Sequence, residues 1–389
     1  MAEDDKGSLL ELPNELLHGT FSHLSLDSIR NLRLVKSRLR KFSRDIFAIH
    51  FTDISSTMSQ KSAQKLQGIS NDPILRDKVE VLHIHAGHWA YGESWVRHSP
   101  TRSPNPRYLE TPNDGTKILS SMLTGGLPNC HSLHLDLDTV VDEPAEYPGI
   151  IISPSDILHI TLCTIASTGV PLKEFAINYA LGRFDSHFID FTVMQSEGFS
   201  SSWETLESLT IGYDIDCPHN SSQLSDFTIS LINQANNLRK LHLKDVRQSG
   251  DTLSAFNQVT LVSMFIADHV DKLKLHRLEH LILECQFLDT NLLPKSLSHS
   301  RDTLRHISLS SIMLVNGYTW KALFQSMQTL LPNLSSIHIH GGYQDESPIS
   351  YPGLQLDPPI PGTGGANINV QKASLEDTYV LDDIWTGIV

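Results

Sequence analysis

A short motif of the form apolar-x-x-apolar-x-apolar recurs along most of the chain, and it constrains the fold more than any other feature. The alternation at the end of each copy is typical of a strand with one buried face. The middle residues of successive copies lie between 26 and 51 residues apart, which leaves room for a helix between strands. The eight copies are Val79-Leu82-Ile84, Cys130-Leu133-Leu135, Leu172-Phe175-Ile177, Leu206-Leu209-Ile211, Leu238-Leu241-Leu243, Leu278-Leu281-Leu283, Leu304-Ile307-Leu309 and Leu334-Ile337-Ile339.

Segments with apolar residues at helical spacing lie between several copies, at 156–166, 224–236, 252–272 and 318–331. A repeated strand and helix favours a curved parallel sheet, because each unit can bury its apolar residues only against its neighbours. The pattern predicts an α/β fold with an irregular solenoid over residues 79–343. The alternative is that the motifs are core strands of an ordinary α/β domain.

The charge, the cysteines and the lengths of the apolar runs indicate which partners and which compartment to expect. The 389 residues include 30 Lys and Arg against 44 Asp and Glu, a balance that disfavours nucleic acid and anionic membranes as partners. After residue 45 the counts are 22 and 37, so the acidic body favours a basic protein partner. The four cysteines are scattered, which argues against a disulfide framework and a cysteine zinc site. With no run of 18 apolar residues and an acidic start, we expect a soluble protein of the cytoplasm, the nucleus or both.

Residues 1–50 are expected to form three short helices. The first runs from Pro13 to Leu24, and Asp27 and Ser37 are the expected N-caps of the other two. Seven basic residues between positions 30 and 44 could form a nuclear-localisation or nucleic-acid patch, but we interpret most of them as the solvated face of these helices. Three such helices bury too little surface to be robust alone, which predicts a docking surface.

The same region contains Leu12-Pro13-Asn14-Glu15-Leu16-Leu17, then Phe21-Ser22-His23-Leu24, Asp27-Ser28-Ile29 and Leu32-Arg33-Leu34-Val35 ahead of basic residues. In order and spacing these motifs resemble an F-box, in the form common in fungal F-box proteins. Thr20 and Leu39 depart from that pattern, which more often has a large apolar residue and Trp.

The resemblance implies binding to the adaptor subunit of an SCF-type cullin–RING ubiquitin ligase and, through it, to cullin. The rest of the chain would be the substrate receptor. An alternative for some of the matching positions is that they only pack the helical core. The adaptor-facing positions would be Leu12, Pro13, Leu16, Leu17, Phe21, Leu24, Leu32 and Val35.

The strand motif is similar to a degenerate leucine-rich repeat. Such repeats usually have Asn or Cys three positions after the last strand leucine, whereas none of the eight corresponding positions has either residue here. The spacing also exceeds the usual 20–29 residues. The resemblance implies a curved sheet whose concave face binds a partner.

Thirteen residues would line that concave face, because they lie between or after the inward apolar positions. Thr210, Ser308 and Ser310 belong to this set together with ten candidate substrate contacts. The pairs His83/His85 and His338/His340 have the spacing of a metal chelate, but we interpret them as solvated strand residues and predict neither a metal site nor a cofactor. The ten candidate contacts are His83, His85, His134, Asp136, Asn178, His242, Lys244, Glu284, His338 and His340.

Three further segments complete the expected organisation. Residues 51–78 read as a helical linker, 86–114 as a Pro-rich insertion, and 344–389 as a Pro/Gly-rich tail whose apolar segment 379–385 folds back over the last repeat. No motif of a nucleotide-binding loop, an elbow serine or a zinc protease is present. The F-box resemblance implies a substrate-recognition subunit of an SCF ligase, and the absence of these motifs favours a non-enzymatic one. A protein-interaction scaffold with a vestigial F-box is the alternative, and a hydrolase assembled from distant residues is a more remote one.

Overall fold

The computed structural model has an α/β fold. It describes residues 12–57, 60–85, 114–137, 153–179, 184, 186, 189–213, 222–245, 272–284, 287–288, 292–314, 320–344, 347–348 and 367–371. In these ranges no helix is long and apolar enough to cross a membrane.

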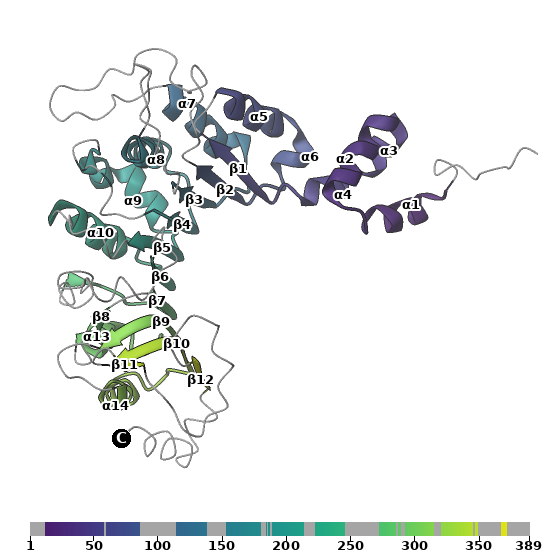
Figure 1. The fold of residues 1–389 in the computed structure, drawn as a ribbon. Helices are drawn as coiled ribbons and strands as arrows, with labels where there is room; N and C mark the ends of the chain where they lie inside the picture. The colour runs from purple at the N-terminus through teal and green to yellow at the C-terminus, as the bar shows by residue number, and fades with distance from the viewer. Residues whose placement is uncertain are drawn as a thin grey trace, which may run out of the picture.

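Nine parallel strands follow one another across the sheet in chain order. Figure 1 shows that they trace an arc with the helices on its outer side. Three short strands join this sheet: β8 (Phe287–Leu288) beside β9, and β11 (Ser347–Pro348) and β12 (Asn367–Gln371) antiparallel to β10. The nine are β1 (Asp53–Thr57), β2 (Val81–His85), β3 (Ser132–Asp136), β4 (Glu174–Ile177), β5 (Ser208–Tyr213), β6 (Lys240–Asp245), β7 (His280–Glu284), β9 (His306–Leu314) and β10 (Ser336–Gln344).

The connecting helices cover one face of this sheet. The most deeply buried is α8 (Pro154–Thr168), which begins at a capping box between Ser153 and Asp156 and ends at Gly169, whose φ of 60° lies in the left-handed region that favours glycine. The others are α5 (Gln60–Asn71), α6 (Pro73–Arg76), α7 (Asp114–Ser121) with a π-helical turn to Gly126, α9 (Glu197–Trp203), α10 (Ser222–Gln234), α13 (Leu292–Ser296) and α14 (Trp320–Leu330).

A single hydrophobic core runs between the sheet and these helices, from Ile54 on β1 to Ile339 on β10. Each central strand contributes two apolar side chains to it, such as Leu82 and Ile84 on β2. The alternate residues point to the opposite face, away from the helices. One face of the sheet is therefore core and the other carries polar side chains.

The N-terminal helices form a separate unit with its own core of Leu17, Phe21, Ile29, Leu39 and Ile46. Figure 1 shows this unit extending away from the β1 end of the sheet. Its four helices are α1 (Asn14–Phe21), α2 (Leu26–Val35), α3 (Ser37–Phe42) and α4 (Arg44–Ile49).

An ion pair fastens the helical unit to the sheet domain. Arg44 on α4 donates to the Asp72 carboxylate at 2.9 Å, and the same carboxylate caps α6 through the amides of Ile74 and Leu75. Burial opposes ionisation of Asp72, but these hydrogen bonds outweigh it and lower the pKa of the carboxyl below its ordinary value.

Most of the expected strands and helices are present in this fold. The eight motif copies all contain strands, and 156–166, 224–236 and 318–331 all contain helices, while residues 252–271 lie outside the described ranges. Most of the insertion and segment 379–385 also lie outside them, but β12 from the same tail does pair with the last parallel strand.

Three expectations were wrong in detail. The stretch 51–78 is not purely helical, because it begins with β1. The cap of α2 is Ser25, which accepts from the Ser28 amide, rather than Asp27 in the first turn. The third expected helix is two helices that meet at Ser43, and Lys36 rather than Ser37 precedes the first of them.

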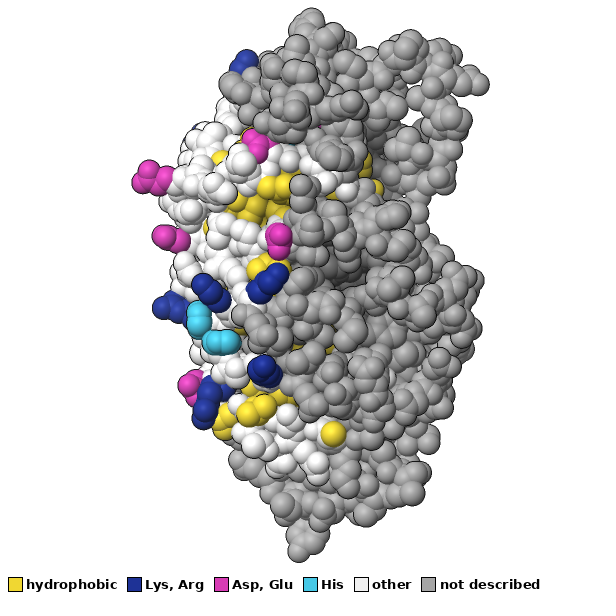
Figure 2. Space-filling view, turned by 90° about the vertical axis from the view of Figure 1, so that its left-hand side faces the viewer, with side chains coloured by type: hydrophobic (Ala, Val, Ile, Leu, Met, Phe, Trp, Pro, Cys, Tyr) yellow, Lys and Arg dark blue, Asp and Glu magenta, His cyan; other side chains and the backbone are white. Residues whose placement is uncertain are grey.

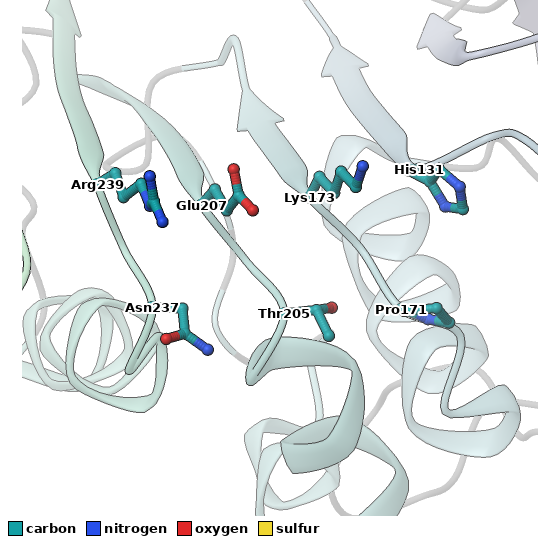
Figure 3. Close-up of a pocket in the computed structure, with 7 residues that line it drawn as sticks. All are labelled: His131, Pro171, Lys173, Thr205, Glu207, Asn237 and Arg239. Atoms are coloured by element: carbon teal, nitrogen blue, oxygen red, sulfur yellow. The ribbon is translucent and has the colours of Figure 1, made fainter.

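Polar side chains three residues before five of the strands tie the turn there to the preceding turn. Each donates to a backbone carbonyl of the neighbouring turn, and Figure 3 shows Thr205 and Asn237 in this tier beneath a row of charged side chains. These bonds are Asn129 to Asp77 at 2.7 Å, Thr205 to Leu172 at 2.9 Å, Asn237 to Glu204 at 2.5 Å, Thr303 to Leu278 at 2.9 Å and Asn333 to Asp302 at 3.2 Å. We call this set the turn ladder.

Replacing Asn237 with Ala should lower the free energy of unfolding by about 1 kcal/mol, because it removes the hydrogen bond to the Glu204 carbonyl and the one that Arg277 donates to Asn237 Oδ1. Urea denaturation at neutral pH measures the change. The matched control is Asn236→Ala at the adjacent exposed position, for which we expect less than about 0.5 kcal/mol. Equal effects in the two variants would show that the turn ladder does not stabilise the stack.

Candidate binding surfaces

The face of the sheet opposite the helices is the first candidate surface, and we call it the open face. Parallel pairing in equal register brings side chains from successive strands into rows across it. One row runs from β1 to β10 and contains Ser55, His83, His134, Ala176, Thr210, His242, Ile282, Ser308 and His338. In the next row, His85 lies beside Asp136, Gly212 beside Lys244, and Ser310 between Glu284 and His340.

The structure thus places all thirteen expected concave residues on one face. It does not bring them into one site, because the rows cross the full width of the sheet. The contacts between them join residues from neighbouring strands.

The densest group of polar contacts lies on β1 to β4. His83 Nδ1 is 2.6 Å from Asp136 Oδ2, and Asn178 Nδ2 donates to Asp136 Oδ1 at 2.5 Å. The other ring nitrogen of His83 lies 3.2 Å from Asp53 Oδ1, and His85 Nε2 lies 4.0 Å from Asp136 Oδ2. One carboxylate therefore faces two imidazoles.

Two similar histidine–carboxylate contacts follow along the open face. His134 Nε2 lies 3.5 Å from Glu174 Oε1, and His242 Nε2 lies 2.9 Å from Glu284 Oε1. The contact with His134 lowers the pKa of Glu174 more than burial raises it. For Asp136, burial opposes ionisation, but hydrogen bonds from Asn178 and His83 outweigh it and lower the pKa. Both carboxylates are therefore ionised at neutral pH.

A third row of the open face was missed from the sequence. Asp53, Glu174, His280 and His306 stand two residues before the expected row, so extending the alternation backwards by one step would have found them. The rings of His280 and His306 stack with their centroids 4.5 Å apart, and His306 bonds to Ser336 at 2.7 Å. Burial and the neighbouring His306 lower the pKa of His280, which favours its neutral form.

The helical unit is the second candidate surface. Of the expected adaptor-facing residues, Leu17 and Phe21 are fully buried in its core. Leu12, Leu24 and Leu32 pack partly against that core, and so combine a structural role with a partly accessible surface. Pro13, Leu16 and Val35 remain exposed.

Sequence reasoning did not select Leu34 and Ile49, which are also exposed large apolar residues of the helical unit. Leu34 is 78% exposed and Ile49 is 63% exposed. Helical periodicity alone does not reveal them, because it identifies apolar residues that point inward.

A pocket of about 350 Å³ lies where β3 to β6 begin. Figure 3 shows Lys173, Glu207 and Arg239 side by side above Thr205 and Asn237 of the turn ladder. The two ladder side chains already donate to backbone, and the charged row alternates in sign. Figure 2 likewise shows acidic, basic and histidine side chains mixed along the described margin of the face it presents. We attribute the pocket to the spacing of the turns.

A cysteine and a histidine meet on α8, with Cys163 Sγ 3.6 Å from His159 Nε2. Such a pair can act as a nucleophile and its base only where a substrate reaches it. Here His159 is 1% exposed and Cys163 is 7% exposed, and His159 Nδ1 accepts the Asp190 amide at 3.2 Å. The pair is part of the core.

Comparison with known proteins finds no family model that matches the chain and no similar curated protein.

The Glu174 contact predicts a specific pH dependence. Because the folded-state pKa of Glu174 is lowered, its contribution to stability is present above its ordinary pKa of about 4.3 and is lost as pH falls through the folded-state value. Glu174→Gln should therefore reduce the free energy of unfolding at pH 7, by less than about 1 kcal/mol. The difference should shrink as pH falls from about 5 toward 3.5.

Urea unfolding across this pH range measures the difference, with Glu204→Gln at an exposed position as the control. A Glu174→Gln effect that is the same at both ends of the range would contradict a role for the ionised carboxylate.

Proposed function

We propose that the chain is the substrate-recognition subunit of an SCF-type cullin–RING ubiquitin ligase and is not itself an enzyme. One observation carries the proposal. The helical unit whose sequence resembles an F-box also exposes several large apolar side chains. Leu16 is 57% exposed and Val35 is 68% exposed, in addition to Leu34 and Ile49. Several exposed large apolar side chains on one small unit favour a protein-binding surface.

The architecture of the helical unit supports this role. Its core is separate from that of the sheet, so a partner can cover its outer side without disturbing the sheet. The Arg44–Asp72 ion pair and the packing of Phe47 against Phe51, with ring centroids 5.0 Å apart, join it to the sheet domain. A partner held by the helical unit would consequently have a defined position relative to the sheet.

We further infer that residues 79–343 form an irregular solenoid of leucine-rich-repeat type, and that its open face contacts a protein substrate. Strand pairing in chain order, helices on one side and the turn ladder all support this inference. On the open face, the parallel register aligns histidines and carboxylates of neighbouring strands in rows across the sheet. Such a surface suits an extended partner that contacts several strands at once.

The mechanism would be catalysis by proximity. The chain would hold the adaptor at one end and the substrate on the open face, and other subunits would transfer ubiquitin. Holding two reactants together raises their effective concentration without any reacting group from this chain. The acidic body favours a basic substrate segment.

The first test measures binding of the purified full chain to the purified ligase adaptor by titration calorimetry. Pro13→Ala/Leu16→Ala removes exposed side chains only, and we expect it to weaken binding at least about tenfold, because a buried apolar anchor is typically worth more than about 1 kcal/mol. Leu330→Ala on α14 is the control, because it removes an exposed leucine from the sheet domain.

If the folded wild-type chain does not bind the adaptor, the ligase proposal fails. The alternative is then a scaffold with a vestigial F-box. The burial of Leu17 and Phe21 is the observation that favours this alternative, because it removes two side chains from the expected contact surface.

The second test asks whether the open face selects the substrate. In cells that lack the chain, proteins that accumulate should return to normal levels when the wild type is restored. They should stay high with Pro13→Ala/Leu16→Ala and equally with His242→Ala/Lys244→Ala on β6. Quantitative proteomics measures these levels.

The control for this test is Lys65→Ala/Gln67→Ala on α5, at exposed positions of the helix side. Restoration of the same proteins by the β6 variant would place substrate recognition elsewhere than on this part of the open face.

A further inference from the structure

We propose that His83, His85 and Asp136 form a binding site for a divalent transition-metal ion, with Zn²⁺ as the best-suited ion. His83 Nδ1, His85 Nε2 and a carboxylate oxygen of Asp136 all lie within 4.8 Å of one another. Two imidazoles and one carboxylate are a donor set that suits Zn²⁺ and other divalent first-row transition metals. The proposal does not depend on the ligase function.

The strands explain why these donors meet. His83 and His85 are two residues apart on β2, so both project from the open face. Parallel pairing places Asp136 of β3 directly beside His85. The site therefore rests on two adjacent strands of the sheet rather than on a loop.

The distances from the Asp136 carboxylate to the two imidazoles would allow an ion to replace the hydrogen bond between His83 and Asp136. Two ligand atoms on a tetrahedral Zn²⁺ lie about 3.3 Å apart, given metal–ligand bonds of about 2.0–2.1 Å. Asp136 Oδ2 is now 2.6 Å from His83 Nδ1 and 4.0 Å from His85 Nε2. A carboxylate movement of about 0.7 Å away from His83 and toward His85 would bring both carboxylate–imidazole distances close to this value. The two imidazole nitrogens lie within 4.8 Å of each other, and side-chain rotation would have to bring them to the same separation.

The surrounding contacts hold the donors in place. Metal-binding histidines usually donate their second ring nitrogen to a carboxylate, and His83 Nε2 lies 3.2 Å from Asp53 Oδ1 on β1. Asn178 donates to Asp136 Oδ1, which leaves Oδ2 directed at the imidazoles. These outer contacts distinguish the group from an accidental surface ion pair.

The site is open on one side. The side chains of His83, His85 and Asp136 are 25%, 39% and 22% exposed. Three protein ligands in an accessible position leave a fourth coordination position for water.

The second His-x-His pair lacks this setting. His338 and His340 on β10 have Ser308 and Ser310 as register neighbours on one side and Asn369 and Asn367 on the other. No carboxylate stands at these four register positions. The pair at β10 therefore supplies a natural control for histidine spacing alone.

The test uses the full chain, freed of metal with a chelator and dialysed, and titrated with ZnCl₂ against a chromophoric chelator at pH 7.5. We expect one Zn²⁺ per chain. His85→Gln and Asp136→Asn should each weaken binding by at least about 100-fold, the upper end of what loss of an outer-shell contact costs. His338→Asn/His340→Asn should bind as the wild type does.

A second readout separates loss of the site from loss of folding. Co²⁺ should give visible absorption bands of a low-symmetry site in the wild type and the β10 variant, but not in His85→Gln. Urea midpoints should show that His85→Gln remains folded, because His85 is partly exposed and its replacement removes no core packing.

Two results would overturn the proposal. One is the absence of stoichiometric binding by the wild type below about 100 µM free Zn²⁺. The other is an unchanged Zn²⁺ affinity in folded His85→Gln.

Discussion

The structure depends on burying apolar residues on one face of the sheet only. Each parallel strand after β1 directs a pair of large apolar side chains toward the helices, as Leu133 and Leu135 do on β3. Since the strands follow chain order, each pair packs chiefly against the pairs before and after it. The opposite face contributes little to this core and can carry imidazoles and carboxylates. The division into a core face and a polar face is thus a consequence of how the chain folds.

The strands were predictable for the same reason. Each expected strand has two large apolar residues spaced two apart after a third one, and this pattern has a direct physical cause in the pleat. β1 was not predictable in this way, because Asp53-Ile54-Ser55-Ser56-Thr57 contains one large apolar residue. Its strand conformation follows from pairing with β2 along its whole length. A contact distant in the sequence determines it, and local pattern cannot reveal such a contact.

The turn ladder shows a different limit of sequence reasoning. Leucine-rich repeats usually have their polar ladder after the strands, and the residues at those positions here are not the expected Asn or Cys. The side chains that link neighbouring turns stand before the strands, as Asn129, Asn237 and Asn333 do. Either position supplies hydrogen-bond donors to turn carbonyls, and backbone carbonyls removed from water need such partners. Turn carbonyls need hydrogen-bond partners in any such fold, but which residue supplies the donor depends on the conformation of the particular turn.

The candidate site was predictable as a face but not as a set of contacts. Alternation alone assigns His83, His85 and Asp136 to one side of the sheet. Their meeting depends on the register between β2 and β3, which are separated by a long insertion, and the sequence contains no signal for that register. The register also puts this group near the β1 end of the sheet, from which the helical unit extends (Figure 1). If the helical unit holds an adaptor and the proposed site holds a metal ion, a partner bound at that ion would lie at the end of the open face nearest to the adaptor. The histidine–carboxylate contact at His242 and Glu284 lies several strands away, so one extended partner could span both. The spacing of polar groups along the open face would then determine both which partner is recognised and where it is held.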